Sequence, residues 1–151
     1  MNQEDKSSIW SKWVLSLSLI VVAAGFCFSF IFTFLFPQAL EPFFTEITGM
    51  TLSNLTAEQI KFHNLLSGVI GGVMIGWGIM LAFLGYRLMK QQEDWIWSAI
   101  AISLIVWYVA DTLTSILVGS SLNVILNSVI LIVALPPLIV NRNSIIEGLR
   151  A

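Results

Sequence analysis

Asp111 is the side chain in this sequence whose position most strongly indicates a chemical role. It lies inside the apolar stretch 95–118 and is the only acidic residue there. A charge at the centre of a bilayer costs about 2.5 to 3.5 kcal/mol on insertion scales, so this aspartate should face protein or water rather than lipid. It therefore requires hydrogen-bonding partners, and carboxylates held in this way form solute sites and proton relays in membrane proteins.

Polar side chains at helical spacing supply candidate partners for Asp111. Ser115 lies one turn after it, on the same helix face. Residues 119–121 make a tight turn, and folding the chain back about this turn brings Asn123 level with Ser115. The same reflection brings Asn127 level with Asp111. We predict a polar site in the outer half of the protein that consists of Asp111, Ser115, Tyr108, Asn123 and Asn127. We expect three further polar residues at its mouth: His63, Asn64 and Ser67.

Two interpretations of this polar site stay open. In the first, Asp111 is a structural clamp that hydrogen-bonds Asn127, since polar side chains also hold membrane helices together. In the second, the site binds a small solute or carries protons, and Asp111 is the group that changes charge.

Other chemistry-bearing residues are sparse. Cys27 is the only cysteine and His63 the only histidine, which excludes an intrachain disulfide, a Cys-ligated metal and bis-histidine haem within the chain. No motif for nucleophilic or phosphate chemistry is present. We therefore expect no metal and no cofactor, and the sequence favours a protein that is not an enzyme.

Gly68, Gly72 and Gly76 form a candidate packing site. Their spacing of four residues places them on one face of a helix. Such a smooth face lets another helix backbone approach closely. We expect it to pack against a helix of the same chain; the alternatives are a homo-oligomer, a larger membrane complex or a ligand groove.

These residues are positioned by four apolar stretches. The 151 residues are 57% hydrophobic and 11% charged, whereas soluble domains carry about 25% charged residues. A helix of about 20 apolar residues crosses a bilayer, and such helices are expected at 13–36, 65–89, 95–118 and 122–140. The sequence predicts an all-α fold, in which residues 1–151 form a single membrane domain: a four-helix transmembrane bundle with one long extracytoplasmic loop at 37–63.

Two local patterns refine these helices. Phenylalanine at every second position from 26 to 36 is typical of a strand, but an unpaired strand would leave its backbone groups unsatisfied in lipid, so a helix is expected. Thr56 and Gln59 fit a capping box, so the second long helix should begin before its apolar stretch.

The distribution of Lys and Arg predicts the orientation. Six of these residues lie in the N-terminal segment, in the connection between the second and third stretches, and in the C-terminal tail. The 37–63 loop contains only Lys61. By the positive-inside rule both termini are cytoplasmic, and we expect the chain in the cell inner (plasma) membrane. The lipid bilayer is the expected partner, because a net charge of −2 with dispersed basic residues does not fit a nucleic-acid surface.

The residues from Phe62 onward, FHNLLSGVIGGVMIGWGIM and later WYVADTLTSILVGSSLNVILN, resemble uncharacterised small four-span bacterial membrane proteins, broadly DoxX-like. The shared features are a glycine-rich second helix, an acidic residue late in the third, and a small-residue turn into an Asn-bearing fourth. The resemblance implies a bacterial inner-membrane location and transfers no catalytic residue. The favoured function is a non-enzymatic helix-packing or accessory module; the alternative is a small-solute or proton-linked transporter or binder using a pocket around Asp111.

Overall fold

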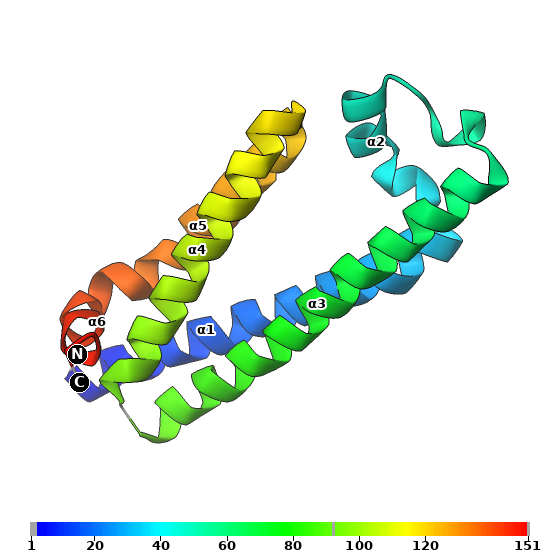
Figure 1. The fold of residues 1–151 in the computed structure, drawn as a ribbon. Coiled ribbons are helices and arrows are strands. Elements are labelled where there is room, and N and C mark those ends of the chain that lie inside the picture. Colours follow the sequence, from blue (N-terminus) through cyan, green and yellow to red (C-terminus); the bar gives the residue numbers. More distant parts are fainter. Residues whose placement is uncertain (1–2, 92, 151) are drawn as a thin grey trace.

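The computed structural model describes residues 3–91 and 93–150, and within these ranges the chain forms helices and no strand. The all-α expectation is therefore confirmed. The long helices are α1 (Gln3–Phe26), α3 (Ala57–Lys90), α4 (Asp94–Val118) and α5 (Ser121–Val140) (Figure 1). The short elements are η1 (Cys27–Leu35), η2 (Pro37–Leu40), α2 (Glu41–Thr48), η3 (Leu52–Asn54) and α6 (Arg142–Gly148).

Four helical stretches are long and apolar enough to cross a membrane. They are Ile9–Leu35, Ala57–Lys90, Asp94–Val118 and Ser121–Val140. These match the four predicted stretches, and α5 continues through Pro136 and Pro137 instead of ending at them.

The second of these stretches begins before its apolar part because α3 is capped in the loop. Thr56 Oγ1 accepts a hydrogen bond from the Gln59 backbone N at 3.3 Å, and Gln59 Oε1 accepts one from the Thr56 backbone N at 2.8 Å. This is the predicted capping box, and it satisfies two N–H groups that a helix start would otherwise leave unpaired.

The phenylalanine-rich part of the first span, η1, is a π-helix that continues α1. Thr33 Oγ1 donates to the Phe28 carbonyl at 2.6 Å, and the Phe36 N–H donates to the Ile31 carbonyl at 2.8 Å. The backbone bond of Phe36 reaches back five residues, which is the π-helical pattern, and the Thr33 side chain bonds the carbonyl that lies five residues before it. The expectation of a helix rather than a strand is confirmed here.

α1 and α3 pack against each other over most of their lengths (Figure 1). The seam on α3 consists of the buried residues Gly71, Gly78 and Gly85, which recur every seven residues. A Cβ added at Gly78 would lie 2.7 Å from Val22 Cγ2 and 3.0 Å from the Ser18 carbonyl oxygen. The helices can approach this closely because glycine has no side chain, and a seven-residue repeat keeps the seam facing one neighbour.

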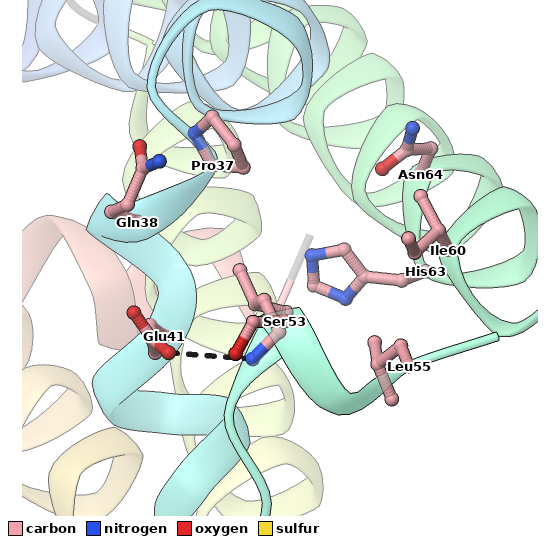
Figure 2. Close-up of a pocket in the computed structure, with 9 residues that line it drawn as sticks. Pro37, Gln38, Glu41, Ser53, Leu55, Ile60, His63 and Asn64 are labelled. Atoms are coloured by element: carbon pink, nitrogen blue, oxygen red, sulfur yellow. Dashed lines mark hydrogen bonds between the residues drawn. The ribbon is translucent and has the colours of Figure 1, made fainter. Parts of the chain in front are cut away.

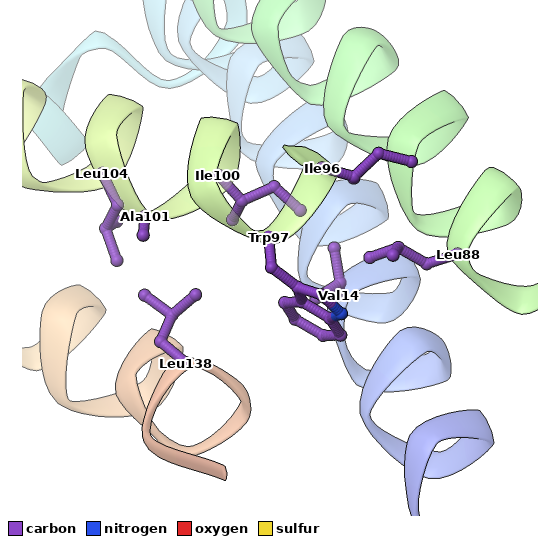
Figure 3. Close-up of a cluster of buried hydrophobic side chains, with 8 residues drawn as sticks. All are labelled: Val14, Leu88, Ile96, Trp97, Ile100, Ala101, Leu104 and Leu138. Atoms are coloured by element: carbon purple, nitrogen blue, oxygen red, sulfur yellow. The ribbon is translucent and has the colours of Figure 1, made fainter. Parts of the chain in front are cut away.

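The α1–α3 pair and the α4–α5 pair meet at one end of the molecule (Figure 1). Both termini and the turn between α3 and α4 lie there, and we call it the terminal end. Trp97 and Ile96 on α4 and Leu88 on α3 are at most 1% exposed there. Figure 3 shows the whole core, which comprises Val14, Leu88, Ile96, Trp97, Ile100, Ala101, Leu104 and Leu138.

The C-terminal helix α6 was not predicted, because only its tertiary contacts distinguish it from a polar tail. It folds back onto α4, where Ser98 Oγ donates to the Ile145 carbonyl at 2.8 Å. Gly148 also lies against α4: a Cβ there would come 2.5 Å from the Asp94 carbonyl oxygen. α6 therefore belongs to the packed terminal end.

The helix pairs diverge away from this core. The rings of Trp77 on α3 and Trp107 on α4 lie 5.9 Å apart between centroids. Beyond that contact the α1–α3 pair and the α4–α5 hairpin separate, and α2 lies near the tip of the hairpin at the opposite, loop end (Figure 1). The four long helices are thus two antiparallel pairs joined at the terminal end.

Candidate functional site

Asp111 is held by two side chains of its own hairpin. Asn123 Nδ2 donates to Asp111 Oδ1 at 2.8 Å and to Ser115 Oγ at 2.7 Å. Ser115 Oγ in turn donates to the Asp111 carbonyl at 2.7 Å. Gly119, with φ of 81°, reverses the chain between α4 and α5, so that Asn123 returns alongside Ser115. The structure therefore brings together three of the residues predicted for the polar site.

Two further members of the predicted site take other partners in the hairpin. Asn127 is 2% exposed, and its Nδ2 donates to Thr112 Oγ1 at 3.3 Å. The Tyr108 hydroxyl lies 3.5 Å from Ser128 Oγ. The structure thus pairs Asn127 with Thr112 rather than with Asp111. Thr112 was missed by the sequence analysis, although it is a polar residue next to Asp111 in the same apolar stretch.

His63, Asn64 and Ser67, expected at the mouth of this site, lie in the first turns of α3. Figure 1 shows that part of α3 on the far side of α2 from the α4–α5 tip. The reason is that α3 packs along α1. As the two helix pairs diverge, the first turns of α3 therefore lie away from the α4–α5 hairpin. Their placement beside Asp111 is therefore wrong.

α2 is joined to the α4–α5 hairpin by Glu46. Its Oε2 accepts a hydrogen bond from Ser120 Oγ at 3.0 Å, and its Oε1 and Oε2 lie 3.1 and 3.2 Å from the Leu122 backbone N. Ser120 is the N-cap of α5, and the unpaired N–H groups and dipole of a helix N-terminus favour an anion there. We call this contact the Glu46 bridge. No local pattern predicts it, because its two sides are more than 70 residues apart in the sequence.

The loop end also contains a pocket of about 390 Å³ between η2, η3 and the first turns of α3 (Figure 2). His63 lines it, and the imidazole lies edge-on to the Phe44 ring, with centroids 5.9 Å apart and planes at 80°. The Nε2 atom of His63 is buried and has no hydrogen-bond partner among the residues that the structure describes. The other lining residues are Pro37, Gln38, Glu41, Leu52, Ser53, Leu55, Ile60 and Asn64.

Gly72 and Gly76 are exposed on α3, and Gly68 is partly buried because its carbonyl accepts a hydrogen bond from Ser29 Oγ of η1 at 3.3 Å. A Cβ added at any of them would meet no described atom within 4 Å. The expectation that they pack against a helix of the same chain is therefore wrong. The chain uses the neighbouring stripe of Gly71, Gly78 and Gly85 for that purpose. In the described ranges no helix packs onto the Cα side of the other three, which we call the open glycine face.

The turn between α3 and α4 is fastened by Glu93. Its Oε2 accepts a hydrogen bond from Trp95 Nε1 at 2.6 Å, and its Oε1 lies 2.7 Å from an Arg87 guanidinium nitrogen. The hydrogen bonds from Trp95 and from Arg87 lower the pKa of the Glu93 carboxyl below its usual value.

Among residues 3–91 and 93–150, no three His, Cys, Asp or Glu side chains are grouped so that they could hold a metal ion. Comparison with protein-family models, with curated proteins and with solved structures finds no match for this chain.

Proposed function

We propose that this chain is a non-enzymatic accessory module of a bacterial inner membrane, and that it associates with a second copy of itself through the open glycine face of α3. The observation that carries the proposal is that no described residue covers the Cα side of these three glycines although they lie on a candidate span. At most 28% of the most apolar part of any span is buried. Ample apolar helix surface therefore stays available for lipid and for other helices.

A second copy fits this face on grounds of charge and symmetry. Between Asn64 and Tyr86, α3 contains no charged residue, so two identical faces meet without like-charge repulsion. Contacts between identical surfaces close as two-fold dimers, and small residues at spacing four are the usual seam for such helix pairs.

Basic residues support an orientation with both termini in the cytoplasm. Arg87 and Lys90 belong to the last turn of α3, and this end of α3 lies at the terminal end (Figure 1). Membrane proteins retain such residues on the cytoplasmic side. The bacterial location and the DoxX-like relationship stay predictions from the sequence resemblance.

The hydrogen bonds of Asp111 support a structural role for this residue. Its carboxylate is engaged by Asn123 of the returning helix, as expected of polar side chains that hold membrane helices together. Stabilising the α4–α5 hairpin therefore explains an aspartate at position 111 without a bound substrate.

The test is the association state of the full chain in mild detergent, measured by native mass spectrometry over a range of protein concentrations. Gly72→Leu should weaken the dimer by about tenfold or more, equivalent to about 1.4 kcal/mol. The matched control is Ala110→Leu, which adds the same side chain at an exposed small residue of α4 and should leave the dimer unchanged. A monomeric wild-type chain, or a Gly72→Leu variant that dimerises like wild type, contradicts the proposal.

A transporter or binder that uses Asp111 is the second candidate, and one observation favours it. Asp111 is only partly buried, on the outer part of α4, where the two helix pairs diverge. In this case Asp111→Asn should abolish pH-dependent uptake of the transported solute or of protons into proteoliposomes. In the accessory module the same variant should dimerise like wild type, and neither chain should transport.

A further inference from the structure

The pocket at the loop end has the dimensions of a ligand site. Its volume of about 390 Å³ falls within the range of about 300 to 1,000 Å³ typical of small-molecule sites. Pro37, Leu55 and Ile60 give it apolar walls, and Glu41 and His63 lie on opposite sides of it (Figure 2). A few polar groups converging on an apolar cavity are the usual composition of such sites.

His63 carries an unsatisfied hydrogen-bonding atom at this pocket. Its Nε2 is buried without a partner in the described chain, whereas buried polar atoms in native proteins are nearly always paired. The contact with Phe44 holds the ring edge-on, so the nitrogen cannot turn freely to solvent. The atom has almost no accessible surface, so a group bound in the pocket supplies the missing hydrogen bond after a small shift of the ring.

The charge of the pocket selects the kind of group. Glu41 is the only charged side chain among the lining residues, all of which lie in the described ranges, and its Oε1 already accepts a hydrogen bond from the Leu52 backbone N at 3.3 Å. A carboxylate without a neighbouring Lys or Arg favours a cation and disfavours phosphate or carboxylate ligands.

We infer that this pocket binds a primary ammonium group. An ammonium has three N–H donors and no acceptor. The Glu41 carboxylate, the Nε2 of a neutral His63 and the amide oxygen of Asn64 supply three acceptors around the same cavity. Each of the three N–H donors thus has an acceptor at the cavity, and the cation pairs with the one charge present.

The ammonium has two sources, the ethanolamine headgroup of a phospholipid and a free small amine from the aqueous phase. The pocket is built by the loop end and the first turns of the candidate span α3, so both a headgroup and a dissolved amine can reach it. This inference is independent of dimerisation through the open glycine face, and Gly72→Leu should bind the ammonium like wild type.

The single histidine of the chain makes a direct test available. Full-length protein labelled with ring-¹⁵N histidine gives one Nε2 signal, which is recorded in phosphatidylglycerol nanodiscs during titration with ethanolamine. A saturable shift of this signal is expected. In phosphatidylethanolamine nanodiscs, a signal already shifted before titration identifies the headgroup as the source, whereas a shift only on addition of ethanolamine identifies the free amine. An Nε2 signal that is unchanged under all of these conditions overturns the inference.

Charge variants separate ammonium recognition from unspecific effects. Glu41→Gln should weaken ethanolamine binding by about tenfold or more, while Glu58→Gln, the matched control in the exposed first turn of α3, should leave it unchanged. Should Glu41→Gln alter the unliganded spectrum through its bond to Leu52, Asn64→Asp provides the opposite change and should strengthen binding. Ethylene glycol, which has a similar size and no charge, should not shift the signal; equal responses to both ligands, or equal affinity in all variants, refute the assignment.

Discussion

Removing the Glu46 carboxylate should separate the two helix pairs at the loop end. The Glu46 bridge joins α2, which is continuous with the α1–α3 pair through η2, to the N-terminus of α5. A hydrogen bond to a charged group contributes about 1.5 to 3 kcal/mol, and an anion at a helix N-terminus about 0.3 to 1 kcal/mol. Glu46 is exposed, so the low end of these ranges applies, and Glu46→Ala should cost about 2 kcal/mol.

A loss of this size changes the ratio of joined to separated helix pairs by roughly 30-fold. The assay is pulsed electron–electron double resonance between spin labels at Lys61 on α3 and Leu117 on α4, both exposed, after replacement of Cys27, the only cysteine, by Ala. The chain with Glu46 should give one narrow distance distribution. Glu46→Ala should give a broader distribution shifted to longer distances.

Two comparisons identify the charge as the cause. Glu46→Gln keeps an acceptor but loses the charge, and should fall between the parent and the alanine variant, because charge-assisted hydrogen bonds are roughly twice as strong as neutral ones. Glu58→Ala removes an exposed carboxylate from the first turn of α3 and should leave the distribution unchanged. A Glu46→Ala distribution identical to that of the parent would refute the assignment of the bridge.

Three further predictions concern the packing seam, the hairpin and the terminal-end turn. Gly78→Leu should destabilise the α1–α3 pair by about 3 kcal/mol through overpacking, seen as a lower midpoint of unfolding in detergent by circular dichroism. Asn123→Ala leaves the Asp111 carboxylate without its 2.8 Å donor and should lower stability by about 1 to 3 kcal/mol in the same assay. The pKa of Glu93 is lowered in the folded chain, so its stabilising effect is complete above the ordinary pKa of glutamate and is lost as the pH falls through the lowered value. The Trp95 indole N–H signal, which reports this hydrogen bond, should therefore titrate below the ordinary pKa of glutamate, and should not titrate in Glu93→Gln.

The sequence predicted the spans and the hairpin because both depend on local patterns. A run of apolar residues is sufficient to predict a spanning helix, and the Thr56 capping box was readable from spacing alone. Counting residues outward from the turn at Gly119 correctly predicted that Asn123 lies at the same height in the hairpin as Ser115. Such a count is accurate near the turn and less so farther away, and the structure accordingly pairs Asn127 with Thr112 and not with Asp111.

The choice between two glycine stripes depended on the partner helix. The stripe of Gly68, Gly72 and Gly76 has the familiar spacing of four, whereas the stripe that packs has a spacing of seven. Ser18 and Gly25 on α1 are also seven residues apart and lie at the seam. The seven-residue spacing was therefore present in the sequence, but it indicates a seam only when the segments of α1 and α3 are compared with each other.

The residues of the long connection could not be placed from sequence, because their positions depend on contacts with distant segments. Glu46 is exposed on a short helix, and only the arrival of the α5 N-terminus beside it gives it a partner. His63 likewise gains its ring contact from Phe44 on α2, and it lines a pocket together with residues of η2 and η3. Neither arrangement has a periodic pattern that would reveal it.

The two ends of the molecule are held together by different physical means. At the terminal end, buried side chains such as Trp97 and Leu88 join the helix pairs through close packing, and separating them would expose a core that resists small displacements. At the loop end, the contact between the pairs includes hydrogen bonds to one solvent-exposed carboxylate, whose loss costs about 2 kcal/mol and exposes no buried core. A change in the angle between the pairs would therefore be centred near the terminal end and be largest at the loop end, where Asp111, the Glu46 bridge and the ammonium pocket all lie. A ligand in that pocket would act on the part of the fold that is least costly to move.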